Sequence, residues 1–73
     1  MKKHIHVDTN EFELAHGRKP KGRGSWVFYF DCHEDEWFAK DDAGYMSMTY
    51  TNALKLAKRE AMRRDAYIIT VAP

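Results

Sequence analysis

A run of basic and structure-breaking residues leads directly into an aromatic segment between positions 18 and 30, and this junction most constrains the fold. The first half, Arg18-Lys-Pro-Lys-Gly-Arg-Gly24, combines four basic side chains with one proline and two glycines, which favours a loop. In the second half, Trp26, Phe28 and Phe30 fall at every second position. Because side chains alternate across a strand, these rings predict one buried face of a strand at about 25–31.

The clearest helix covers about 50–64. Ala53, Ala57 and Ala61 recur there at helical spacing and predict a buried face of small side chains. Such a face would let the helix lie close to a sheet whose aromatic side chains fill the remaining space. Thr49 or Thr51 can supply the oxygen that caps the helix N-terminus.

Short alternating segments elsewhere predict further strands. These are 4–7, 11–14 with Phe12 and Leu14 buried, 36–40, 45–49, and 66–71, the last buried on both faces. The resulting order is β-β-β-β-β-α-β. It predicts an α+β fold, in which a small antiparallel β-sheet carries one helix packed on one face. The length of 73 residues predicts a single domain spanning 1–73.

The number of cysteines and the hydropathy of the sequence indicate where in the cell the protein is located. The single cysteine, Cys32, excludes an internal disulfide and fits a reducing environment, where we expect an exposed loop thiol. No apolar run approaches the roughly 20 residues of a membrane-spanning helix. The sequence therefore predicts a cytoplasmic protein that does not contact a membrane.

The net charge of +1 conceals a segregation along the chain. Residues 1–24 carry six basic and three acidic side chains. Residues 25–50 carry one basic and six acidic side chains, and residues 51–73 carry five basic and two acidic ones. The basic parts are suited to an anionic partner, while the acidic middle would oppose one.

Cationic and aromatic side chains together predict a small non-enzymatic module that binds DNA or RNA. Cations neutralise phosphates, and aromatic rings offer faces on which bases stack. The loop residues of this predicted site are Arg18, Lys19, Lys21 and Arg23; the aromatic residues are Trp26 and Tyr29; and the helix residues are Lys55, Arg59 and Arg63.

Residues 22–64 resemble the DNA-binding domains built from a three-stranded sheet and one helix, such as AP2 domains and the arm-binding domains of tyrosine integrases. The resemblance rests on Gly24-Ser-Trp-Val-Phe28, Glu36-Trp-Phe38 and Tyr50-Thr-Asn-Ala-Leu-Lys-Leu-Ala57, in that order. It implies that Trp26 and Trp37 are scaffold residues, with Ala53, Ala57 and Ala61 on the packed helix face. It supports a fold more than a function.

Two other classes of function compete with nucleic-acid binding. An enzyme is not expected, because the short chain has no acid–base or nucleophile constellation and no predicted cofactor. A small protein-interaction or inhibitory accessory protein of a phage or mobile element is the alternative, with the acidic hairpin region as its interface. Zinc binding by His4, His6, Cys32 and His33 is not expected, since their spacing matches no zinc motif.

Overall fold

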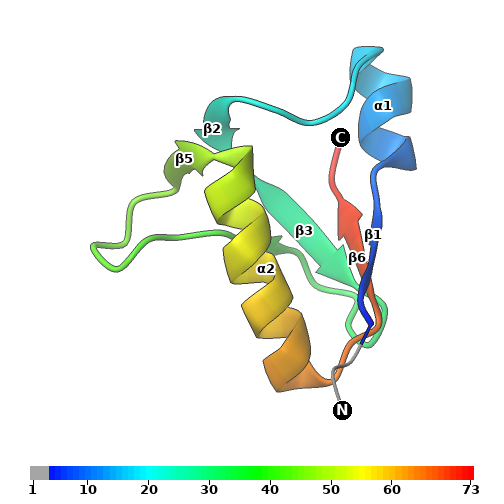
Figure 1. Ribbon diagram of the computed structural model, residues 1–73, viewed down its shortest axis with the longest axis vertical. Helices are drawn as coiled ribbons and strands as arrows, with labels where there is room; N and C mark the ends of the chain where they lie inside the picture. The colour runs from blue at the N-terminus through cyan, green and yellow to red at the C-terminus, as the bar shows by residue number, and fades with distance from the viewer. Residues whose placement is uncertain (1–3) are drawn as a thin grey trace.

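The computed structural model describes residues 4–73, in which two helices and six strands form a two-layer α+β fold (Figure 1). In chain order the elements are β1 (His6–Asp8), α1 (Asn10–His16), β2 (Arg23–Ser25), β3 (Val27–Phe30), β4 (Trp37–Phe38), β5 (Ser47–Thr49), α2 (Tyr50–Arg64) and β6 (Ile68–Val71). The α+β class is confirmed. The sheet, however, is mixed and has a second helix beside it, so the prediction of a purely antiparallel sheet with one helix is wrong.

The main sheet has the strand order β1-β6-β3-β4, which places the C-terminal strand between the first strand and the aromatic strand. Strand β6 runs parallel to β1 and antiparallel to β3. The β3–β6 register pairs Phe28 with Val71 and Phe30 with Ile69, and all four side chains are buried. Directly paired residues point to the same face of a sheet, so these four form one apolar face.

Helix α2 covers that apolar face, and its bounds match the predicted segment (Figure 1). Ala53, Ala57 and Ala61 are fully buried, which confirms the predicted helix face. The side-chain oxygen of Thr49 accepts a hydrogen bond from the backbone N–H of Asn52 at 3.3 Å, as an N-cap does. The small alanine side chains leave the space between the layers to the sheet's larger residues.

The segment predicted as a strand at 11–14 is helix α1 instead. Phe12 is buried as expected, but Leu14 is 87% exposed, because a helical spacing of two residues places side chains on opposite sides. Residues that favour the start and the end of a helix flank this segment, and they outweigh its short alternation of polar and apolar residues. The Asp8 carboxylate accepts a hydrogen bond from the N–H of Asn10, and Gly17 ends the helix in the left-handed conformation, donating its N–H to the Glu13 carbonyl.

The strand predicted at 45–49 pairs with the end of the basic loop rather than with its sequence neighbour. Strands β2 and β5 form a separate two-stranded antiparallel sheet, in which Gly24 pairs with Met48. Strand β4 has two residues and, within residues 4–73, pairs with β3 alone. Strand β6 is fully buried on one face only, since Ile68 is 39% exposed and Thr70 is half-buried on the other.

Candidate functional site

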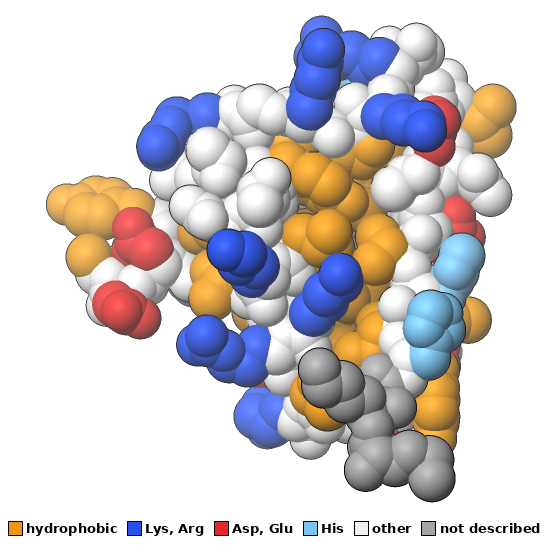
Figure 2. All heavy atoms as spheres, viewed as in Figure 1, with side chains coloured by type: hydrophobic (Ala, Val, Ile, Leu, Met, Phe, Trp, Pro, Cys, Tyr) orange, Lys and Arg blue, Asp and Glu red, His pale blue; other side chains and the backbone are white. Residues whose placement is uncertain are grey.

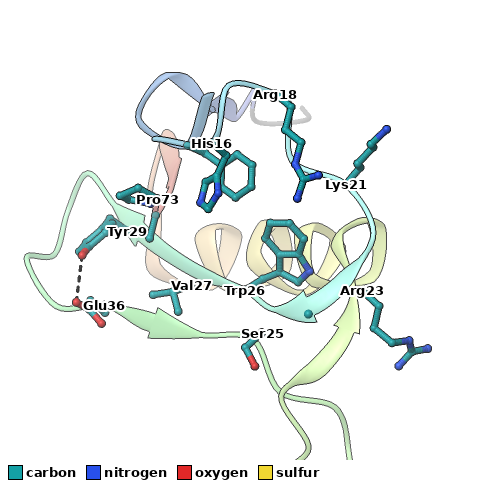
Figure 3. Close-up of a pocket in the computed structure, with 13 residues that line it drawn as sticks. His16, Arg18, Lys21, Arg23, Ser25, Trp26, Val27, Tyr29, Glu36 and Pro73 are labelled. Carbon is teal, nitrogen blue, oxygen red and sulfur yellow. Dashed lines mark hydrogen bonds between the residues drawn. The ribbon is translucent and has the colours of Figure 1, made fainter. Parts of the chain in front are cut away.

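The basic loop and the aromatic strand meet at one open cleft of about 500 Å³ (Figure 3). Arg18 and Lys21 extend from the loop above it, Arg23 from β2, and Tyr29 from β3. The Arg18 side chain is directed toward the aromatic floor, whereas Lys21 and Arg23 extend outward (Figure 3). Lys19, the fourth predicted loop cation, is exposed but does not line this cleft. The structure therefore brings three of the four loop cations to the strand they precede.

Trp26 holds this region together rather than offering a free ring. Its indole N–H donates to the Met48 carbonyl at 3.2 Å, and its ring centroid lies 4.9 Å from that of Tyr50 and 5.6 Å from that of Phe12. Only 7% of the residue is exposed. Trp26 thus joins α1, the β2–β5 pair and α2, and a base could stack on little of its surface.

Tyr29 occupies the opposite end of the cleft, on the sheet face that points away from α2. Its hydroxyl donates a hydrogen bond to a Glu36 carboxylate oxygen at 3.1 Å. This bond is the main reason that the pKa of Tyr29 is raised above its usual value, and burial adds to the effect. The phenol is therefore neutral and held in one orientation by its neighbour.

A second hollow of about 420 Å³ lies between β2, β5 and α2. Arg23 borders this hollow as well as the first cleft, and Lys55 and Arg59 of α2 line its other side. Arg23 consequently connects the cations of the loop with those of the helix. Asp41 and Asp42 complete the lining from the β4–β5 loop, so carboxylates border the cationic surface at this edge.

The outer surface of α2 is strongly basic. The helix carries five basic side chains and a single acidic one, Glu60. Figure 2 shows Lys and Arg side chains spread from the top of the molecule over α2, with acidic side chains at the tip of the β4–β5 loop. Lys and Arg side chains therefore extend from the top edge of the molecule over the outer surface of α2 (Figure 2).

Arg63 differs from the other predicted helix cations because it is paired. Its guanidinium donates two hydrogen bonds to the Glu60 carboxylate, one of them at 3.0 Å, and Arg64 donates a third at 2.6 Å. Arg64 also lies over the Phe30 ring, 5.0 Å from its centroid. The hydrogen bonds from both arginines lower the pKa of Glu60 to about 2, against a partial opposing effect of burial.

This pairing predicts a pH-dependent contribution to stability. Because the pKa of Glu60 is lower in the folded protein than in the unfolded chain, its stabilisation is complete above about pH 4.5 and is lost as the pH falls toward about 2. We expect Glu60→Gln to lower the free energy of unfolding by at most about 3 kcal/mol at pH 7 and by much less near pH 2. Denaturant unfolding at both pH values measures this; an equal loss at both would contradict it.

Phe38 is a candidate residue that the sequence-based site omitted. It pairs with Val27 across β3 and β4, while its neighbour Trp37 pairs with Phe28 on the α2 side. Phe38 therefore points to the same open face as Tyr29 and is 42% exposed. Strand alternation was the available signal, because an inward Trp37 requires an outward Phe38.

The remaining candidates concern metals, thiols and membranes. Among residues 4–73, no three His, Cys, Asp or Glu side chains gather as potential metal ligands. Cys32 is exposed, as expected, and its thiol lies 3.8 Å from the Arg64 carbonyl oxygen. No helix in this same range is long and apolar enough to cross a membrane.

Comparisons with protein-family models, with curated proteins and with solved structures found no match to this chain.

Proposed function

We propose that this protein is a small nucleic-acid-binding module. The observation that carries the proposal is the position of Arg23, which lines both the cleft of Arg18 and Lys21 and the hollow of Lys55 and Arg59. Cations that are far apart in the sequence thus form one connected surface. A row of cations of this kind can follow a phosphate backbone and release its counterions.

The proposal also accounts for the aromatic side chains beside the cations. Nucleic acids present bases as well as phosphates, and Tyr29 lies in the same cleft as Arg18 and Lys21. Compared with the sequence-based site, the proposed surface retains Lys19 as a flanking cation. It assigns no phosphate contact to Arg63, whose guanidinium is bound to Glu60, and no stacking to the buried Trp26.

The test compares two arginines whose replacement changes the net charge equally. Arg23→Gln is expected to weaken binding to a labelled oligonucleotide. It should also reduce the slope of log affinity against log salt concentration by the contribution of about one phosphate contact. Arg63 lies outside both hollows, so Arg63→Gln is expected to change the affinity for the oligonucleotide little. Fluorescence anisotropy titrations at low salt measure both affinities. Equal weakening by the two variants would indicate diffuse charge attraction rather than a site.

A protein partner is the second candidate function, and the β4–β5 loop supports it. Tyr45 is 70% exposed there, close to Asp41 and Asp42 in the chain. The Asp41 carboxylate accepts hydrogen bonds from the N–H groups of Ala43 and Tyr45, so the turn is ordered internally. An exposed aromatic ring on an ordered acidic turn suits a basic protein surface. Absence of binding to any oligonucleotide at low salt would favour this candidate.

The resemblance to three-stranded DNA-binding domains stays a prediction. In this chain the strands of residues 22–64 belong to two sheets, with β2 and β5 in one and β3 and β4 in the other. The proposed surface consists of the loop, α2 and the cleft between them, and it does not depend on that resemblance.

A further inference from the structure

We infer that the nucleic acid recognised here is single-stranded, and that the open face of the main sheet, with Tyr29 and Phe38, is where its bases stack. The inference rests on the proposed function and specifies its ligand. It starts from two rings on neighbouring strands that the fold leaves accessible on the face opposite α2.

The sheet register places both rings on this face. Val27 pairs directly with Phe38, and Tyr29 follows Val27 by two residues on the same strand. Tyr29 and Phe38 are therefore diagonal neighbours on one face, and such positions lie about 7–8 Å apart. Tyr29 is half-buried and fixed by its hydrogen bond to Glu36, while Phe38 is 42% exposed.

The distance between the two rings favours single-stranded nucleic acid over a duplex. Bases in one strand of a duplex are about 3.4 Å apart, which is half the distance between these ring positions. Two stacked bases of a duplex therefore cannot each cover one ring, whereas bases of an extended single strand can separate to do so. Duplex bases are also stacked on one another and paired, so their faces are closed to side chains.

The charges around the cleft set the direction in which a strand would lie. Arg18 and Lys21 stand at one side of the cleft and the Glu36 carboxylate at the other, beside Tyr29. Phosphates are attracted to the first side and repelled from the second. A single strand that follows the cations with its backbone consequently turns its bases toward Tyr29 and the sheet face beyond it.

The apolar surface of the open face is consistent with this ligand. Ile68 of β6 is 39% exposed on the same face, and Thr70, the next outward residue of β6, pairs with Tyr29. Base faces are apolar and flat, so they can cover Phe38 and Ile68, whose side chains carry no charge. Two accessible rings with a cationic border on one side thus form a surface suited to unpaired bases, whose phosphates stay away from Glu36.

The experiment uses the full chain and two aromatic substitutions. Fluorescence anisotropy compares a labelled oligodeoxythymidine of about 12 nucleotides with a mixed-sequence duplex of about the same length, a size within the range of single-strand binders. We expect tighter binding to the single strand. Phe38→Leu, which keeps an apolar side chain, is expected to weaken single-strand binding by about fivefold or more and to leave duplex binding unchanged.

Tyr45→Leu is the matched control, because it removes another exposed ring, this one from the acidic β4–β5 loop. It is expected to change neither affinity. If single strand and duplex bind equally and Phe38→Leu has no effect, the stacking inference is overturned while the proposed function stands. If neither nucleic acid binds at low salt, the proposed function fails and the inference fails with it. Far-UV circular dichroism of each variant establishes that the fold is retained.

Discussion

Phe28→Ala is expected to lower the free energy of unfolding by about 3–5 kcal/mol, the range measured for removing a large buried ring. Phe28 is fully buried, pairs with Val71 across β3 and β6, and its ring centroid lies 6.2 Å from that of Trp37. Removing the ring opens a cavity beneath α2 that small alanine side chains cannot fill. A domain of this size has a total stability of only about 4–11 kcal/mol, so much of it would be lost. Chemical denaturation followed by circular dichroism measures the change.

Phe38→Ala is the control for that measurement. It removes the same ring from the adjoining strand, but on the open face of the sheet, where Phe38 is already 42% exposed. We expect a loss of about 1–2 kcal/mol, because part of the ring is already exposed and no closed cavity forms. Similar losses for the two variants would show that α2 does not cover the assigned face.

The parts of the fold that the sequence predicts well are those with a long repeated signal. Helix α2 has 15 residues, so alanines at helical spacing outweigh any accidental pattern, and both its bounds and its buried face are confirmed. Trp26, Phe28 and Phe30 give a similarly strong signal for β3, because three large rings at alternate positions are typical of a strand with one buried face.

The errors fall where the signal is short or the partner is distant in sequence. Four alternating residues around Leu14 fit a strand or one turn of helix equally, and the end signals at Asp8 and Gly17 decide for a helix. The parallel pairing of β1 with β6 joins the two ends of the chain, for example His6 with Ile68. Local pattern holds no information on such pairing, so the mixed sheet could not be predicted.

The candidate site likewise has parts that the sequence predicts and parts that depend on pairing between distant segments. The loop cations and the basic side of α2 follow from composition and helical spacing, but the role of Arg23 in joining them depends on the β2–β5 pairing. Tyr29 lies on the outward side of its strand, as alternation predicts. Trp26 is predicted both as core and as a stacking residue, and it is buried. Phe38 is absent from the predicted site, although strand alternation places it opposite its tryptophan neighbour.

The salt dependence of binding is the functional prediction with the largest expected effect. Each phosphate neutralised on a single strand contributes about −0.7 to the slope of log affinity against log salt concentration, so four contacts predict a slope near −3. Between about 50 and 200 mM salt, affinity for the single strand should then fall about 60-fold. The four contacts are assigned to the joined surface: one each to Arg18, Lys21 and Arg23, and one to the helix cations Lys55 and Arg59.

A double substitution identifies which cations produce this slope. Arg18→Gln with Lys21→Gln removes two cations from the lining of the cleft and should flatten the slope by about 1.4. Lys58→Gln with Arg63→Gln changes the net charge equally on α2, outside both hollows, and should leave the slope nearly unchanged. Loop cations bury little surface, so thermal unfolding of the first variant should match that of the unaltered protein.

The most direct test of the central claim is therefore an anisotropy titration of the unaltered protein and these two double variants at several salt concentrations. Nucleic-acid binding through the joined cationic surface predicts a slope near −3 that is flattened by the Arg18 and Lys21 double variant and not by the Lys58 and Arg63 double variant. A slope near zero, no binding at low salt, or equal flattening by both double variants would contradict it.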